Sequence, residues 1–249
     1  MKITVVTVCY QAENTIEETI QSVLSQEYQD MEYLIIDGKS TDRTMEIVRQ
    51  HADDSRMRVI SEKDTGLYNA MNKGSKEANG EYIIFLNSGD FFADKRVLTD
   101  MAPYLTKDIV FGNVIRRFKD REILEKYPGK QVVLWLLLQG KMMSHQVIFT
   151  KTSVMRRYGF DETYRITADY DFLVRARHDK CSMQYVDRTV SIVENCEGIS
   201  SVSANLEQMR KEDDQSLKRN FPGYYYLLKP VKAAARCIKK CIGEEDAEY

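Results

Sequence analysis

The stretch Glu81–Asp90, EYIIFLNSGD, decides how the rest of the chain is interpreted. Its first part, Tyr82–Leu86, is an aromatic and β-branched run long enough for one buried strand. Its end has the composition of a turn and closes on the carboxylate of Asp90. Because ligands of open α/β sheets bind at the carboxyl ends of strands, an acid placed here can hold a divalent cation, which can bind a diphosphate. For these four residues alone an ordinary Asx-type turn is the simpler interpretation, so the rest of the chain must decide.

Strand-like and helix-like segments alternate before this stretch. Strands are expected at Lys2–Cys9, Tyr33–Ile36 and Arg58–Ile60, and each is followed by a segment with helical spacing of apolar residues. This alternation predicts βαβ units and a mostly parallel sheet flanked by helices. The G-x-G-x-x-G fingerprint and the P-loop pattern are absent after all of these strands. The first half therefore predicts a Rossmann-like α/β sheet whose strand ends carry acids instead of glycines.

Composition excludes several classes of protein. Of 249 residues, 43% are hydrophobic and 30% are charged, which is ordinary for a soluble globular chain. The net charge of −2 provides no overall basic field, so we expect no nucleic-acid partner. The 5 cysteines are scattered without metal-ligand or disulfide spacing, which favours free thiols in a reducing compartment. No signal-peptide pattern is visible, and the longest apolar run, Val132–Leu138, is too short to span a bilayer, so we expect a cytoplasmic protein.

The second half of the chain is less regular. Strands are expected at Asp108–Phe118, Arg121–Leu124, Gln146–Phe149 and Met183–Val193, the first two forming a hairpin. A helix is expected within Tyr164–Lys180. The apolar segment Val132–Met143 is either a buried helix or a loop that covers the cleft.

The last fifty residues are charged and aromatic. Glu207–Arg219 is expected to form a solvated helix. The tail Tyr224–Ile242 combines tyrosines and leucines with lysines and arginines. It could form an amphipathic helix that touches anionic lipid at the cytoplasmic membrane face, or Tyr224–Leu228 could pack on the rest of the protein.

Several short motifs occur in a fixed order along the chain. They are Thr7–Tyr10 with Asn14, Ile36–Asp42, Ser61–Gly74, Gly80–Tyr82 with Leu86–Asp90, His145-Gln146, Ala168–Asp171 and Glu197–Ser200. Together they resemble the family 2 glycosyltransferases of the GT-A fold, and within that family the group that builds bacterial capsules and exopolysaccharides of the colanic-acid type. The resemblance implies a GT-A domain over residues 1–200, with a nucleotide-sugar half (1–95) and a less regular acceptor and catalytic half (96–200). A helical, basic and aromatic extension would follow over 201–249.

The resemblance also implies a reaction and a donor site. The enzyme would transfer a hexosyl or N-acetylhexosaminyl group from a nucleoside-diphosphate sugar, with UDP expected first, to a glycan or lipid-linked saccharide in surface polysaccharide biosynthesis. The residues that would contact the nucleotide sugar are Thr7, Tyr10, Asp37, Asp64, Lys73, Ser88 and Gly89. Carboxylates can accept hydrogen bonds from a uracil imide or a ribose hydroxyl, which suits two of them. The alternatives are that Asp37 only shapes a turn and that Lys73 is a solvated lysine on its helix.

Asp90 matches the last acid of the family's Asp-x-Asp-type motif, the acid that usually reaches the metal. Here Asn87 and Gly89 replace the other two acids. One carboxylate, two diphosphate oxygens and water still suffice for Mg²⁺ or Mn²⁺, so this departure predicts weak metal binding without nucleotide. His145 is a further candidate for the metal or the substrate, and a purely structural role is its alternative.

Asp169 matches the catalytic acid of the family's Glu-Asp motif, with Ala168 in place of the Glu. An inverting transfer is a single in-line displacement at the anomeric carbon, and it needs a general base near the acceptor hydroxyl. The alternative is that Asp169 only caps its helix. Asp171 is the weaker candidate for the base because it would point elsewhere on the same helix.

Two other functions compete with this one. The first is a degenerate GT-A domain that binds a nucleotide sugar or a partner without turnover, which the thinned acidic motif favours and the presence of Asp90 and Asp169 opposes. The second is a nucleotidyltransferase, a class that carries a glycine-rich loop with Lys or Arg after the first strand. Residues 8–13, VCYQAE, do not resemble such a loop.

Overall fold

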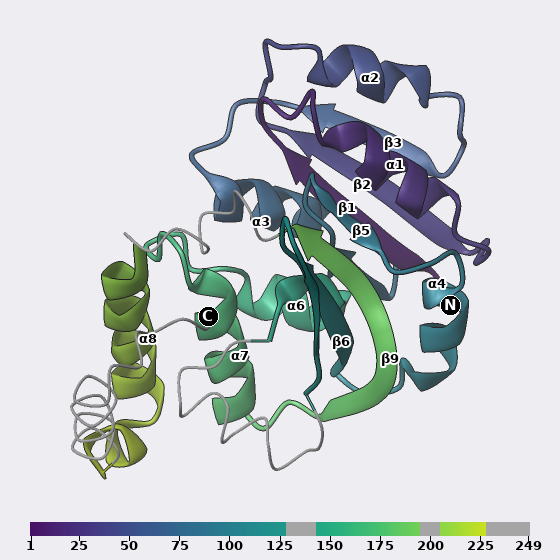
Figure 1. Ribbon diagram of the computed structural model, residues 1–249. Helices are drawn as coiled ribbons and strands as arrows, with labels where there is room; N and C mark the ends of the chain where they lie inside the picture. Colours follow the sequence, from purple (N-terminus) through teal and green to yellow (C-terminus); the bar gives the residue numbers. More distant parts are fainter. Residues whose placement is uncertain (128–142, 195–204, 228–249) are drawn as a thin grey trace.

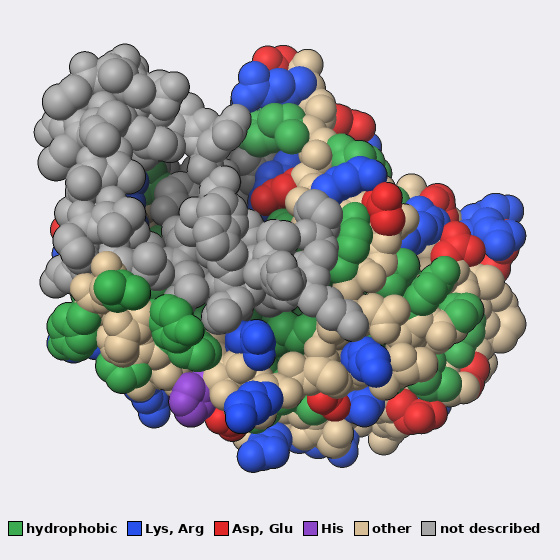
Figure 2. Space-filling view, turned by 90° about the horizontal axis from the view of Figure 1, so that it is seen from below, with side chains coloured by type: hydrophobic (Ala, Val, Ile, Leu, Met, Phe, Trp, Pro, Cys, Tyr) green, Lys and Arg blue, Asp and Glu red, His purple; other side chains and the backbone are tan. Residues whose placement is uncertain are grey.

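The computed structural model describes residues 1–127, 143–194 and 205–227 (Figure 1). In these residues nine strands form one sheet in the order β3-β2-β1-β4-β8-β6-β9-β5, and β7 pairs with β6. Figure 2 shows acidic and basic side chains interspersed over the visible part of one face. No helix in the described ranges is both long and apolar enough to cross a bilayer.

The first half is a parallel sheet built from βαβ units, as the alternating pattern predicts. Its strands are β1 (Ile3–Cys9), β2 (Met31–Asp37), β3 (Met57–Ser61) and β4 (Tyr82–Phe85), joined by helices α1 (Ile16–Leu24), α2 (Thr44–Gln50) and α3 (Leu67–Glu77). Since such crossovers are right-handed, α1 and α2 cover one face and α3 covers the other. The register places Cys9 beside Asp37 and Asp37 beside Ser61, so the carboxyl ends of three strands lie together.

The second half extends this sheet with mixed pairing. Strand β8 (Ile148–Lys151) pairs antiparallel with β4 and with β6 (Ile109–Arg117), which forms the predicted hairpin with β7 (Glu122–Glu125). Strand β6 is parallel to the long, bent strand β9 (Met183–Glu194) (Figure 1). The far end of β9 pairs with β5 (Asp90–Phe92), so the bend returns the sheet to the carboxyl end of β4.

The helices of the second half surround this extension. They are α4 (Val97–Met101), which continues into the 3₁₀ turn η1 (Ala102–Tyr104), the 3₁₀ turn η2 (His145–Val147), α6 (Thr152–Tyr158), α7 (Ala168–His178) and α8 (Leu206–Asn220). Helix α8 lies against α7 (Figure 1). An aromatic cluster joins the two halves: Phe160 packs on Tyr68 of α3, Phe85 of β4 and Phe172 of α7, with ring centroids 5.5, 5.5 and 5.8 Å away.

Two sequence-based expectations about elements are wrong. The strand expected at Gln146–Phe149 begins only at Ile148, because the preceding residues form η2. Helix α8 is not simply solvated: Met209, Glu212, Asp213, Ser216 and Leu217 are buried. Elements β5, α4 and α6 were not anticipated. The segment Val132–Met143, apart from its buried last residue, the motif Glu197–Ser200 and the tail from residue 228 lie outside the described residues.

Candidate active site

The strand ends of β1, β2 and β3 are tied together by Asp37. Its side chain is fully buried, and its carboxylate accepts hydrogen bonds from the Ser40 amide (3.1 and 3.2 Å) and from the Ser61 hydroxyl (2.6 Å). That Asp37 contacts the nucleotide stays a prediction: in the structure its oxygens hold the turn after β2 against the end of β3. This is the turn-shaping alternative.

Thr7 also faces the protein interior. It has no exposed surface, and its hydroxyl donates to the Leu86 carbonyl (2.7 Å) and accepts from the Tyr33 hydroxyl (3.0 Å). That Thr7 contacts the nucleotide likewise stays a prediction. In the structure its side chain fixes the end of β4, immediately before the turn that carries Asp90.

Tyr10 and Asp64 are the predicted donor residues that reach the surface. Tyr10 is 65% exposed and Asp64 is partly exposed. They flank Gly38, where a Cβ would lie 2.6 Å from Asp64 Oδ2 and 3.2 Å from the Tyr10 ring. The absence of a side chain at position 38 is therefore what lets an aromatic ring and a carboxylate meet over the ends of β1 and β2. Such a pair can stack on a base and accept a hydrogen bond from it or from a ribose.

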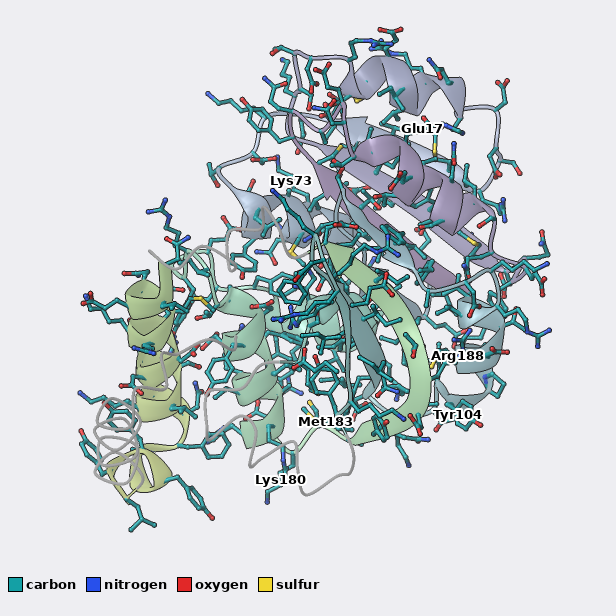
Figure 3. All side chains as sticks on the ribbon, viewed as in Figure 1. Glu17, Lys73, Tyr104, Lys180, Met183 and Arg188 are labelled. Carbon is teal, nitrogen blue, oxygen red and sulfur yellow. The ribbon has the colours of Figure 1, made fainter. Side chains whose placement is uncertain are left out.

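Lys73 holds the segment that leads to Asp64. It projects from α3 (Figure 3), donates to the Lys63 carbonyl (2.7 Å) and forms an ion pair with Glu62 (3.0 Å). The charge of Lys73 is thus paired within the protein. Its side chain holds the loop that leads to Asp64, which differs from the solvated lysine of the alternative interpretation.

The turn between β4 and β5 is fixed against helix α1. The Ser88 hydroxyl is 2.8 Å from that of Thr15, and the Gly89 amide donates to the Thr19 hydroxyl (3.0 Å). Gly89 has φ = 95°, a conformation that L side chains rarely adopt, which explains a glycine between the serine and Asp90. Ser88 and Gly89 therefore determine where Asp90 lies.

Asp90 is 7% exposed, and one of its oxygens accepts a hydrogen bond from Gln146 Nε2 (2.7 Å). Burial raises the pKa of Asp90 to about 6, although the bond from Gln146 and the nearby charges of His145 and Arg116 act in the opposite direction. A nearby cation would favour the ionised form and relieve this cost of burial.

The residues present fit a cation that takes most of its ligands from elsewhere. Besides Asp90, the same turn offers Asn87 Oδ1, a buried oxygen without a hydrogen-bond partner in the structure. The described ranges contain no group of three or more His, Cys, Asp or Glu side chains that could hold a metal. One carboxylate and one amide oxygen suit Mg²⁺ or Mn²⁺ only when diphosphate oxygens and water complete the shell.

His145 connects the Asp90 turn to helix α7. Its Nδ1 lies 2.9 Å from Asp169 Oδ2, and its Nε2 lies 2.9 Å from Asn87 Nδ2. Because a carboxylate only accepts, Nδ1 carries the proton, and Nε2 accepts from the Asn87 amide. Both ring nitrogens thus have partners within the protein, and Nδ1 contacts Asp169, so the candidate role of His145 at the metal stays a prediction.

Asp169 is the second residue of α7 and is 4% exposed. Its Oδ1 accepts from the Tyr170 amide (3.0 Å) and lies 3.2 Å from the Tyr68 hydroxyl, whose proton is directed at the Ile166 carbonyl, and its Oδ2 accepts from His145. Burial and the charge of Asp169 raise the pKa of Tyr68 well above its usual value, so this phenol remains a donor. Asp171 points away, toward Ser216 and Arg175.

The structure thus brings together two acids that are far apart in the sequence. Consecutive residues of η2 bind one each, Gln146 to Asp90 and His145 to Asp169. The roles of Gln146, Asn87 and Tyr68 were missed from sequence, although all three lie within the motifs that carry the resemblance. Only their partners, which are distant in sequence, reveal what they do.

Comparison with known proteins identifies the family of this chain. The family model "Glycosyl transferase family 2" matches residues 4–165, so the chain belongs to that family. It is 28% identical over 200 residues to a PGL/p-HBAD biosynthesis glycosyltransferase of Mycobacterium bovis, covering 77% of this chain and 76% of the relative. The predicted family is confirmed, and the chain is a glycosyltransferase by family.

Solved structures confirm the GT-A fold. The chain superposes on S. aureus TarS 1-349 in complex with UDP-GlcNAc with a TM-score of 0.71 at 19% identity, covering 89% of this chain and 68% of that one. For the Pyrobaculum calidifontis mannosyltransferase PcManGT in complex with GDP-Man and Mn²⁺, the TM-score is 0.61 at 18% identity, with 94% and 68% covered. Asp169 and α8 lie beyond the residues that the family model matches.

Proposed function

We propose that this glycosyltransferase moves a sugar, with inversion, from a nucleoside-diphosphate donor to a glycan or lipid-linked saccharide in surface polysaccharide biosynthesis. The observation that carries the proposal is the η2 turn, which ties the donor-side acid Asp90 to the candidate base Asp169. UDP is the first expectation for the nucleotide, supported by the motif resemblance and by the fold likeness to a protein that binds UDP-GlcNAc.

In the proposed reaction Asp169 accepts the proton of the acceptor hydroxyl. Its Oδ2 receives one hydrogen bond, from His145, so a lone pair remains for the acceptor. The acceptor oxygen attacks the anomeric carbon as the bond from that carbon to the diphosphate breaks, and the nucleoside diphosphate leaves with the electron pair. Mg²⁺ or Mn²⁺ at Asp90 and Asn87 would supply charge neutralisation for the diphosphate. Tyr10 and Asp64 bind the nucleoside.

The location is also a proposal: a cytoplasmic enzyme that touches the membrane surface where a lipid-linked acceptor would be found. Tyr224, Tyr226 and Leu227 are 50%, 60% and 69% exposed, and hydrophobic side chains gather on the side of the molecule where α8 lies (Figure 2). Exposed aromatic and aliphatic side chains are suited to a lipid interface. Phe221 and Tyr225 instead pack on the protein, which supports the second interpretation of this segment.

A domain that binds a nucleotide sugar without turnover is the second candidate. The loss of two acids from the Asp90 turn favours it. The ordered contacts around Asp169 oppose it, because a carboxylate held by two donors, the Tyr170 amide and His145, suits a base.

Thermal unfolding with a panel of UDP-, GDP-, CMP- and dTDP-sugars, each with and without Mn²⁺, tests the donor assignment. A ligand that binds only the folded protein adds about 2.7 kcal/mol of stability at 100 times its Kd. We expect the midpoint to rise with one nucleotide, and to rise more with Mn²⁺. If no nucleotide shifts the midpoint, the proposed donor site is wrong.

Gly38→Ala is expected to raise the donor KM about tenfold, which corresponds to about 1.4 kcal/mol. The added methyl would lie 2.6 Å from Asp64 Oδ2, so the carboxylate and the Tyr10 ring would have to move apart. The backbone at Gly38 is outside the left-handed region, so the strain is confined to these side chains. Gly223→Ala is the control, because a Cβ there meets nothing within 4 Å. An unchanged donor KM in folded Gly38→Ala would argue against a donor role for both side chains.

A further inference from the structure

Helix α8 holds the segment that leads into α7. Glu212 of α8 is 4% exposed, and its carboxylate accepts the backbone amides of Arg165, Ile166 and Thr167 at 3.0, 3.0 and 2.9 Å. Gln208 and the Thr167 hydroxyl donate to the same carboxylate. Burial alone would raise the pKa of Glu212, but these hydrogen bonds outweigh it and hold the pKa below its usual value, so the group is ionised at neutral pH.

The same segment is held from its other side by α3. The Tyr68 hydroxyl donates to the Ile166 carbonyl and also lies 3.2 Å from Asp169 Oδ1. The chain from 165 to 167 is therefore fixed between an acid of α8 and a phenol of α3. Asp169 follows this segment by two residues, so its backbone position depends on both contacts.

A second contact joins α8 to α7 one turn further on. The Ser216 hydroxyl donates to Asp171 Oδ1 (2.6 Å), and Arg175 Nε donates to Asp171 Oδ2 (2.6 Å). Asp171 has no exposed surface. Two buried acids thus join α8 to the start of α7. Glu212 of α8 binds the segment before α7, and Asp171 of α7 accepts from Ser216 of α8.

From these contacts we infer that Glu212 is a positioning residue for Asp169, so that α8 is part of the catalytic apparatus. The inference rests on the proposed function, in which Asp169 is the base. Catalysis by a base depends steeply on geometry, and a misplacement of 1 Å can lower the rate about 10²-fold. Glu212 accepts hydrogen bonds from three consecutive backbone amides just before the proposed base. This arrangement suits the positioning of the base, and stabilisation of a surface helix alone would not require it.

The variants Glu212→Ala and Glu212→Gln separate positioning from mere folding. Alanine leaves three buried amides without an acceptor, whereas the glutamine oxygen can still accept from Ile166 and Thr167. We expect kcat to fall about 100-fold in Glu212→Ala and about tenfold in Glu212→Gln. The donor KM should stay within about twofold in both, because the residues proposed to bind the donor lie on other elements. Glu207→Ala is the matched control: the Glu207 side chain is 81% exposed on the same helix, and its one ion pair among the described residues is with Lys211.

The measurement is release of UDP from UDP-GlcNAc with water as acceptor, or of the nucleoside diphosphate from the donor that the unfolding panel selects. It is made well below each variant's unfolding midpoint. In the double variant Glu212→Ala/Asp169→Asn, we expect no further loss beyond Asp169→Asn alone, because both changes act through the same group.

Full activity of folded Glu212→Ala, beside an inactive Asp169→Asn, would overturn the inference and leave the proposed function standing. If the losses of kcat from the two single variants multiply in the double variant, the inference is overturned too, because Glu212 would then affect turnover independently of Asp169. Full activity of Asp169→Asn would overturn the proposed function, and the inference with it.

Discussion

Asp169→Asn is expected to lower kcat for glycosyl transfer about 10³-fold, the scale of a lost general base. The amide cannot take the acceptor proton, but its oxygen can still accept from the Tyr170 amide. Its NH₂ group would face His145 Nδ1, which can accept once the ring proton moves to Nε2. We therefore expect the fold and the donor affinity to be retained.

The measurement pairs turnover with the nucleotide-dependent shift of the unfolding midpoint. Asp179→Asn, at the exposed C-terminal end of the same helix, is the control for the substitution itself. A variant at 169 that keeps more than about a tenth of wild-type kcat would contradict the assignment of the base.

Asp90→Asn is expected to have two opposite effects: loss of metal-dependent donor binding and a gain in stability at neutral pH. The first follows because a neutral amide is a poor ligand for a divalent cation in a site with one carboxylate. The second follows from burial, which raises the pKa of Asp90 from 3.8 to about 6. The variant keeps an oxygen that can accept from Gln146.

The pH dependence of this gain has a definite sign. A carboxyl whose folded pKa lies above its unfolded value stabilises the fold fully below the unfolded value, and this stability is lost as the pH rises through the folded pKa. Relative to Asp90→Asn, the wild-type protein should therefore lose up to about 3 kcal/mol of stability between pH 4 and pH 7.

The corresponding measurement is thermal unfolding at pH 4.5 and 7.5, with and without nucleotide and Mn²⁺. At pH 7.5 the midpoint of Asp90→Asn should exceed that of wild type by about 6 to 12 °C, and the two should approach each other at pH 4.5. With donor present at pH 7.5, addition of Mn²⁺ should raise only the wild-type midpoint further. A variant that binds donor and Mn²⁺ like wild type would remove Asp90 from the metal site.

Sequence reasoning was most reliable where a local pattern determines the outcome. Alternating strands and helices predicted the parallel half of the sheet, and the acid after Tyr82–Leu86 does lie at a strand end. The helix within Tyr164–Lys180 does carry Asp169 in its first turn.

The features of the site that sequence reasoning missed depend on contacts between residues that are far apart in sequence. Whether Asp37 faces a ligand or the interior depends on Ser61, which the strand register brings beside it from 24 residues away. Glu212 lies in a strongly charged helix, and nothing in that composition reveals that its carboxylate meets backbone amides 45 to 47 residues earlier. Tertiary contacts of this kind overrule an expectation based on polarity alone.

The η2 turn also limits how chains of this architecture can diverge. Neighbouring residues of this turn hydrogen-bond to Asp90 and Asp169, so a residue inserted between His145 and Gln146 would break one of these two hydrogen bonds. Chimeras that combine halves of two relatives should therefore inherit the turn, both acids and Asn87 from one parent. The tip of the β6–β7 hairpin, where Arg117 pairs with Glu122 on the surface, takes no part in these two hydrogen bonds. Diversity among related enzymes can accumulate there while the chemistry stays constant.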